Sequence, residues 1–99
     1  MENDFDAIQG VFFFDPKDRI YPDHFPGSPV VPGSVIIHSF FSAARQAGLL
    51  SSGLSIDRFR FKSFVVPGEY EYRIRVREKD IICELYQGAE MMVEGRLNR

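Results

Sequence analysis

The chain has 99 residues, enough for one domain and too few for a second hydrophobic core. Hydrophobic residues make up 44% of it and charged residues 26%, which is typical of a soluble globular protein and excludes a disordered or fibrous one. The net charge of -2 argues against a broad nucleic-acid interface, which needs a clustered basic surface. We therefore expect a single domain over residues 1–99.

The cysteine content and the first residues bear on location. Cys83 is the only cysteine, so an intrachain disulfide is excluded and a reducing compartment is favoured. Residues 1–6 carry acidic side chains and no basic ones, unlike the basic start of a secretory signal. Since no apolar run approaches the roughly 20 residues of a membrane span, we expect a cytoplasmic protein without one.

The first third of the chain is rich in phenylalanine and then in proline. Ile8–Phe14 predicts a strand, followed by a turn over residues 15–18 and a short return segment at Arg19–Tyr21. Four of the six prolines and two glycines lie between Pro22 and Gly33. A helix or a central strand cannot persist through such a segment, so we expect an ordered loop of the kind that often carries function.

One helix is predicted over Ser34–Ala47, with Ser34 as its N-cap and Gly48 as the left-handed residue after its end. Its apolar positions cover most of its circumference, which indicates a buried helix. Its polar residues form one narrow stripe because they are spaced by three or four positions. The stripe consists of Ser34, His38, Ser42 and Arg45.

The rest of the chain predicts strands. Alternating apolar and polar residues, separated by turns at residues 66–69 and 87–89, place them at Asp57–Phe64, Tyr70–Arg77, Ile81–Tyr86 and Met91–Leu97. A nearly all-apolar helix must be covered, and a curved antiparallel sheet of five or six strands wrapped around it does so. We expect an α+β domain whose helix is completed by a partner subunit.

Two segments carry a family resemblance. Asp23–Val35, with the letters DHFPGSPVVPGSV, resembles the signature of the 3-hydroxyacyl-thioester dehydratases of bacterial fatty-acid synthesis. Phe59–Glu69 resembles the strand and turn that follow the central helix in that family. The combination of HFPG with a second Pro-Gly at this spacing is specific, whereas HFPG alone is weak. The resemblance implies a hot-dog fold.

The resemblance also implies an assembly and a reaction. Members form homodimers, and sometimes assemblies of dimers, in which two helices lie side by side under one continuous sheet with acyl tunnels at the interface. The substrate is a (3R)-3-hydroxyacyl group on acyl carrier protein or on CoA, and a lyase reaction removes water to give a trans-2-enoyl thioester. No cofactor is implied, and the two histidines and one cysteine match no zinc pattern.

The resemblance assigns roles to particular residues. His24 is the expected base, since histidine titrates near pH 6.5 and can take a proton at neutral pH. Gly33 is expected to offer its N–H to the thioester oxygen at a helix N-terminus, where free donors and the helix dipole stabilise negative charge. The substrate is expected to contact further residues of the loop and the helix. These are Phe25, Pro26, Gly27, Pro32, Ser34 and Ser42.

The sequence departs from the family at the expected acid. The family carries Glu or Asp five residues after the glycine, and commonly Gln four residues later, where this chain has His38 and Ser42. Three interpretations stay open: His38 as a protonated acid in a dehydratase, a related activity such as thioester hydrolysis, or a non-catalytic acyl-binding or partner subunit. The structural alternatives are a surface or capping role for His24 and a buried, hydrogen-bonded role for His38.

Basic residues alternate along two of the predicted strands. Arg58, Arg60 and Lys62 share one strand, and the arginines at 73, 75 and 77 share the next. Such a face would suit an acidic carrier protein. The alternative is a solvated outer face of the sheet.

Overall fold

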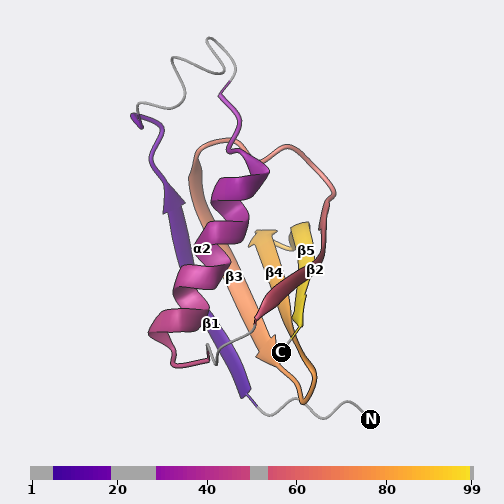
Figure 1. Ribbon diagram of the computed structural model, residues 1–99. Helices are drawn as coiled ribbons and strands as arrows, with labels where there is room; N and C mark the ends of the chain where they lie inside the picture. Colours follow the sequence, from indigo (N-terminus) through magenta and orange to yellow (C-terminus); the bar gives the residue numbers. More distant parts are fainter. Residues whose placement is uncertain (1–5, 19–28, 50–53, 99) are drawn as a thin grey trace.

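The computed structural model describes residues 6–18, 29–49 and 54–98. One α-helix and five strands follow in the order β1 (Asp6–Phe14), α2 (Gly33–Gln46), β2 (Ser55–Phe61), β3 (Gly68–Val76), β4 (Asp80–Gln87) and β5 (Glu90–Asn98). The strands form one sheet in the order β1-β3-β4-β5-β2, and every neighbouring pair is antiparallel. Helix α2 lies along one face of this sheet, next to β1 and β3 (Figure 1). The predicted α+β architecture is therefore confirmed, with five strands.

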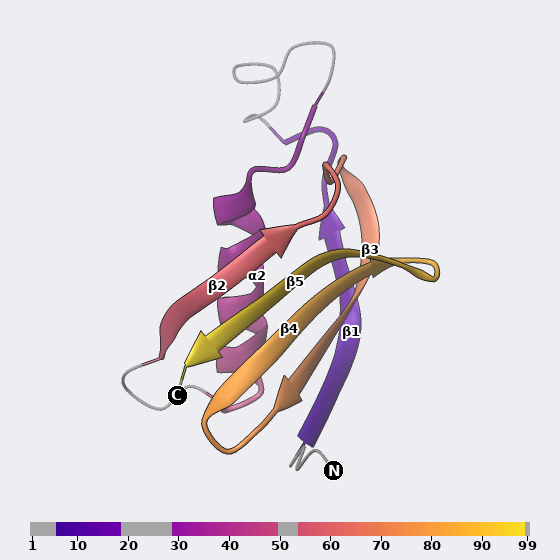
Figure 2. The same cartoon turned by 90° about the vertical axis from the view of Figure 1, so that its right-hand side faces the viewer.

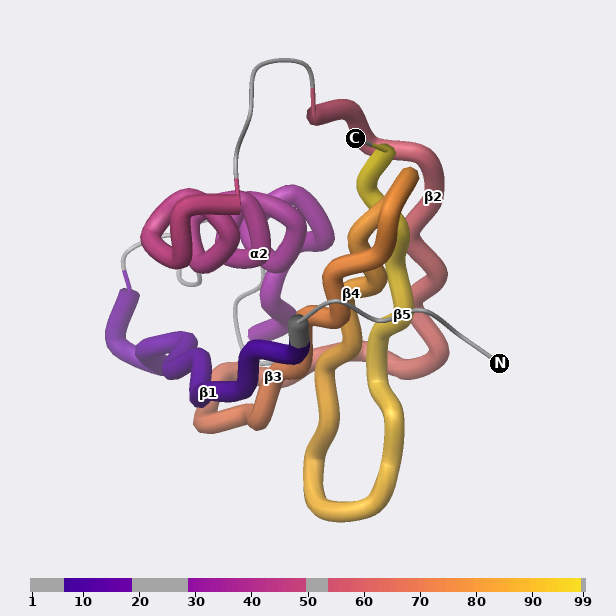
Figure 3. The backbone as a smooth tube through the Cα atoms, turned by 90° about the horizontal axis from the view of Figure 1, so that it is seen from below, coloured from indigo at the N-terminus to yellow at the C-terminus, as the bar shows by residue number. Residues whose placement is uncertain are grey.

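The sheet is strongly twisted and curves around the helix. Figure 2 shows β4, β5 and β2 turning away from the direction of β1, and Figure 3 shows the sheet bordering α2 on two sides. Register shifts between Ile56 and Arg58 in the β2–β5 pair, and between Leu85 and Tyr86 in the β4–β5 pair, interrupt the ladder. Irregularities of this kind bend a strand and increase its local twist.

Alternation along the strands separates a core face from an outer face. In β3, Tyr70, Ile74 and Val76 are buried, while the residues between them are exposed or half-buried. This is the predicted period-two pattern. β4 is different: all six residues of Asp80–Leu85 are buried, since the strand lies in the middle of the sheet.

The core is built on aromatic rings from strands and helix. Phe40, in the middle of α2, is fully buried. Its ring centroid lies 5.1 Å from that of Phe12, 6.2 Å from that of Tyr72 and 6.1 Å from that of Phe59. Rings at these separations attract one another beyond the effect of their buried area. They fix the helix against β1, β3 and β2 together.

The ends of β1 and α2 explain where these elements stop. The Asp15 side chain accepts a hydrogen bond from the Lys17 amide (2.8 Å), and its carbonyl accepts one from the Asp18 amide (3.0 Å), which closes the predicted turn. At the end of α2, Gly48 has a φ of 77° and Leu49 donates to the Ala44 carbonyl (2.9 Å). A left-handed residue here is the usual glycine helix stop, as predicted.

Two boundaries differ from the sequence prediction. The second strand begins at Ser55 and ends at Phe61, so the segment leading to Phe64 is a loop, with Phe64 exposed. Gly68 is not inside a turn but opens β3, where its φ of 146° lies outside the range that side chains favour. The predicted return segment Arg19–Tyr21 lies outside the described residues.

The contact between Gly95 and Phe59 generates a prediction about stability. The two residues are paired across β5 and β2, and an alanine Cβ at position 95 would overlap the Phe59 ring. We expect Gly95→Ala to lower the free energy of unfolding by about 1–3 kcal/mol, because the ring must leave its place in the core. Urea unfolding measures this loss. In a Phe59→Leu background the loss should shrink; an equal loss there would assign it to the backbone and not to the ring.

Burial of Cys83 generates a prediction about reactivity. The side chain has no exposed surface, and burial, with a smaller contribution from Glu84, raises the pKa of the thiol to about 12. At pH 8 the thiol is therefore protonated, and the thiolate is the reactive form. A chromogenic disulfide reagent should label Cys83 only after urea unfolding. Fast labelling of the folded protein would contradict this placement.

Candidate functional site

The amino end of α2 leaves backbone donors available. The helix starts at Gly33, and the Pro32 carbonyl accepts the first intrahelical bonds from the amides of Val35 (3.0 Å) and Ile36 (3.2 Å). The amides of Gly33 and Ser34 precede those bonds, as the first amides of any α-helix do. These two N–H groups, together with the positive end of the helix dipole, can stabilise negative charge.

Ser34 is not the N-cap, and that prediction is wrong. The cap position belongs to Pro32, which has an extended backbone (φ -60°, ψ 144°) and makes no side-chain cap hydrogen bond. The chain turns into the helix one residue earlier than the preference for serine suggested, which places Ser34 inside the first turn, exposed. The helix amides at this end are therefore not taken up by a capping side chain.

Gly33 is in close contact with β2. A Cβ at this position would lie 3.0 Å from Cζ of Phe61, so the absent side chain lets the Phe61 ring approach the start of the helix. Sequence reasoning predicted a glycine here so that a carbonyl can approach. The contact with Phe61 adds a packing reason that the sequence did not reveal, since it depends on how β2 lies beside the helix.

Two hydrogen bonds fix the segment before the helix. The Val31 amide donates to the Val65 carbonyl (2.7 Å), and the Tyr70 hydroxyl donates to the Val66 carbonyl (2.7 Å). Val31, Val65 and Tyr70 are all buried. Burial raises the pKa of Tyr70, and the bond to Val66 opposes this only in part, so the hydroxyl stays protonated and able to donate. The loop between β2 and β3 therefore holds the entry to α2.

The predicted polar stripe lies on the side of α2 that faces away from the sheet. Ile36, Phe40, Ala43 and Ala44 form the buried side, whereas His38 is exposed and Ser42 half-buried. Nε2 of His38 and Oγ of Ser42 lie 3.5 Å apart, a long hydrogen bond whose direction depends on the imidazole tautomer. Within one chain, then, His38 is open to approach from a second molecule. A fully covered helix, expected from its apolar sequence, is not formed by a single chain.

The remaining predicted site residues divide between two groups. His24, Phe25, Pro26 and Gly27 lie outside the described residues. Pro32 and Gly33 are half-buried at the start of the helix.

A groove opens on another side of the helix, beside β1. It has a volume of about 390 Å³ and combines an apolar wall with the carboxylates of Asp15 and Asp18. It is lined by residues 11–14 of β1, Asp15, Asp18, Val35 and Ser39. The Ser39 hydroxyl bonds to the Val35 carbonyl (2.9 Å) and is thereby satisfied within the helix. His38 is absent from this lining, so one chain does not bring the groove and His38 together.

The search for metal sites and membrane spans gave two findings. Among the described residues, no cluster of three or more His, Cys, Asp or Glu side chains is arranged to hold a metal ion. In the same part of the chain, no helix has both the length and the apolar character needed to cross a membrane.

Comparison with known proteins identifies relatives over nearly the whole chain. The family model described as ApeI-like, ApeI dehydratase, matches residues 1–96. A 3-hydroxyacyl-[acyl-carrier-protein] dehydratase FabZ from Desulforamulus reducens is 30% identical over 96 residues, covering 82% of this chain and 67% of the relative. FabZ from Bordetella parapertussis is 31% identical over 107 residues, covering 92% and 68%. A match to FabZ from Campylobacter fetus covers 50% of that relative, so this chain spans between half and about two thirds of these proteins.

Solved structures share the fold. A chain of the dehydratase heterocomplex ApeI:P from Xenorhabdus doucetiae aligns with a TM-score of 0.75 at 19% identity, covering 99% of this chain and 96% of that one. The fluoroacetyl-CoA-specific thioesterase FlK aligns with a TM-score of 0.66 at 14% identity, covering 98% and 85%. These likenesses confirm the predicted hot-dog fold, and the match over residues 1–96 confirms the predicted relationship: the chain belongs to the ApeI-like dehydratase family.

Proposed function

We propose that the protein is a hydro-lyase that removes water from (3R)-3-hydroxyacyl thioesters to give trans-2-enoyl thioesters. The observation that carries this proposal is the match of residues 1–96 to the ApeI-like dehydratase family. FabZ relatives named as 3-hydroxyacyl-[acyl-carrier-protein] dehydratases favour an acyl carrier protein as the group that presents the substrate, with CoA as the alternative. A cytoplasmic role in fatty-acid or related lipid synthesis follows from that substrate.

The reaction divides among three residues. His24 takes a proton from C2, and the Gly33 N–H stabilises the negative charge that develops on the thioester oxygen. The C2=C3 double bond forms as the C3–O bond breaks, and the protonated imidazole of His38 gives its proton to the departing hydroxyl, which leaves as water. Exchange with solvent returns His24 to its neutral form and His38 to its protonated form. Support for the oxyanion role comes from the position of the Gly33 amide before the first intrahelical bonds of α2.

Substrate contacts are assigned to residues around these three. Pro32, Ser34 and Ser42 would contact the substrate from α2 and its approach, and Ser42 lies 3.5 Å from His38, close enough to orient the imidazole. Phe25, Pro26 and Gly27 would contact the acyl chain from the loop.

A homodimer would complete this site. His38 lies on the face of α2 opposite the sheet, so a second chain must bring another reacting group to it. Ile37, one turn after Gly33, and Phe41, a further turn on, stay partly exposed on the flank of α2 that meets Phe61 of β2. Pairing of β2, an edge strand, with the β2 strand of a second copy would place two such flanks side by side. Apolar side chains of β2 support this choice of edge, since Ile56 is 52% exposed.

A second candidate function is that of a partner subunit. The structurally similar Xenorhabdus chain comes from a dehydratase heterocomplex, and His38 stands where the dehydratases carry a carboxylate. In that case a related chain would supply the acid. Hydrolysis of the thioester is a third outcome, which the fold shared with FlK keeps open.

Incubation with a short 3-hydroxyacyl thioester, followed by mass spectrometry, tests these functions. We expect a product lighter by one water and, from a 2-enoyl thioester, a product heavier by one water. His24→Ala should lower kcat by about 10²–10⁴-fold, the usual contribution of a general base. Free acid as the product would establish a thioesterase, and bound but unchanged thioester would establish the partner role.

The role of His38 is tested by a pair of variants. His38→Glu restores the carboxylate of the dehydratases and should retain measurable turnover, whereas His38→Phe keeps the ring volume without a proton donor and should lose it. The pH profile separates a chemical role from a structural one, because only a change of acid moves its basic limb. If His38→Phe keeps the activity and the profile of the parent protein, another group is the acid.

Sedimentation velocity tests the dimer. We expect the protein to sediment at twice its 11.4 kDa mass and Ile56→Lys to sediment as a monomer, because a charge would be placed at the β2 seam. Val11→Lys is the matched control, since Val11 is similarly exposed (54%) but lies on β1, at the other edge of the sheet. A parent protein that is monomeric at all concentrations, or a monomer produced by Val11→Lys alone, would exclude pairing through β2.

A further inference from the structure

A second hollow lies on the outer face of the sheet, on the side opposite α2. It has a volume of about 170 Å³ and is formed by strands β4, β5 and β2. Arg58, Arg60, Glu94 and Arg96 surround it, and Ile82 and the backbone of Gly95 complete it. No residue of the proposed catalytic group lies in it. The hollow therefore stands apart from the site described above.

The strand register brings like charges together here. Arg58 pairs directly with Arg96 across β2 and β5, and Arg96 pairs on its other side with Ile82 of β4. Like charges directly opposite one another destabilise a sheet, so this arrangement calls for a compensating anion. Burial of Ile82, which is 8% exposed, limits the water that can separate the two guanidinium groups.

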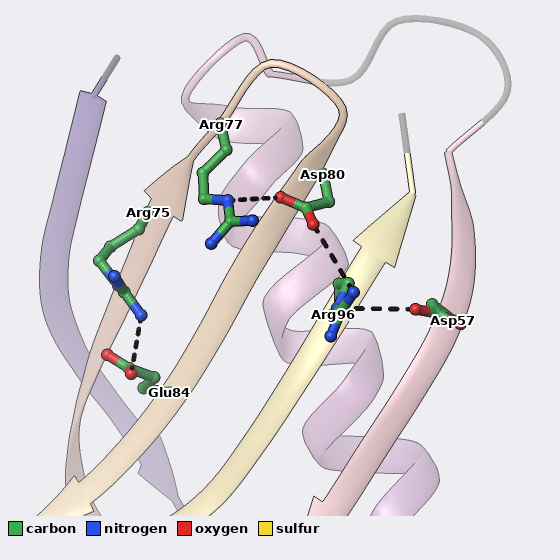
Figure 4. A network of polar contacts seen from close by, with 6 residues as sticks. All are labelled: Asp57, Arg75, Arg77, Asp80, Glu84 and Arg96. Carbon is green, nitrogen blue, oxygen red and sulfur yellow. Dashed lines mark hydrogen bonds and ion pairs between the residues drawn. The ribbon is translucent and has the colours of Figure 1, made fainter. Parts of the chain in front are cut away.

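Carboxylates within the chain compensate only one of the arginines. Nε of Arg96 lies 3.6 Å from Oδ2 of Asp57, and its Nη1 lies 3.9 Å from Oδ2 of Asp80, as Figure 4 shows. In residues 6–18, 29–49 and 54–98, no ion pair joins Arg58 or Arg60 to a carboxylate. Two arginines that face the same hollow are therefore available to an external ligand.

The spacing of these two arginines suits a tetrahedral oxyanion. They are two residues apart on one face of β2, so their Cα atoms are separated by roughly 7 Å and both side chains can reach one ligand. A guanidinium group presents a planar fork of N–H donors that matches phosphate oxygens in pairs. Glu94 pairs with Arg60 and opposes an anion, which places the ligand toward Arg58.

We propose that this hollow binds a phosphate group, held by Arg58 and Arg60 and framed by the carboxylate-anchored Arg96. The phosphate is either free or a monoester on a larger molecule, since the same N–H donors serve both. This proposal does not rest on the dehydratase activity, because its donors lie on the face of the sheet away from α2.

Calorimetric titration with inorganic phosphate at pH 7.5 and constant ionic strength tests the proposal on the whole chain. We expect saturable binding of one phosphate per chain, weakened on the order of tenfold by Arg58→Gln or Arg60→Gln because each removes a charge-assisted pair. Glu94→Gln should tighten binding, since it removes the opposing charge. The matched control is Arg73→Gln, which removes an arginine of the same outer face, beside Tyr86, and should leave binding unchanged.

Adenosine 3′-monophosphate distinguishes the two sources of phosphate. Tighter binding than inorganic phosphate indicates a monoester on a larger molecule, and equal binding indicates that the phosphate alone is recognised. Thermal unfolding of each variant checks that the fold is kept. Absence of saturation at tens of millimolar phosphate, or equal weakening by Arg73→Gln, would overturn the proposal and would leave the dehydratase assay unaffected.

Discussion

The position of α2 depends on one aromatic contact group centred on Phe40. Its ring has no exposed surface and meets rings from both edge strands and from β3, so three strands that are distant in sequence converge on the middle of one helix. Phe12 and Tyr72 are themselves stacked, with centroids 4.1 Å apart. A displacement of the helix would separate several ring pairs at once. The amino end of α2, where Gly33 offers its amide, is therefore placed by packing a full turn or more away.

Much of the fold follows from the sequence because its elements differ in period. The alternation through Tyr70–Val76 predicts a strand with one buried face, and the glycine after the helix predicts the stop at residue 48. Register is different. The irregularities between Ile56 and Arg58 and between Leu85 and Tyr86 arise from how curved strands meet, which local preferences do not specify. The pairing of Arg58 with Arg96 follows from that register and was equally hidden.

The candidate site was predictable in its residue types and less so in its geometry. The HFPG and Pro-Gly letters identified the family, and the spacing of His38 and Ser42 correctly placed both on one helix face. The preference of serine for N-caps misplaced the helix start, because Pro32 already has the extended backbone that a cap position needs. The contact between Gly33 and Phe61 joins residues from separate elements, so no local pattern announces it. Whether His24 faces His38 is decided between chains, which one sequence cannot encode by periodicity.

The two hydrogen bonds that join the β2–β3 loop to its surroundings make this loop part of the helix entrance. Val65 holds Val31, and Tyr70 holds Val66, so the chain on either side of the loop shares one rigid unit with the start of α2. A relative that lengthens or shortens this loop must also re-form the support beneath the helix. Grafting a foreign loop into this protein would accordingly require its own tyrosine and its own partner strand to be transferred with it.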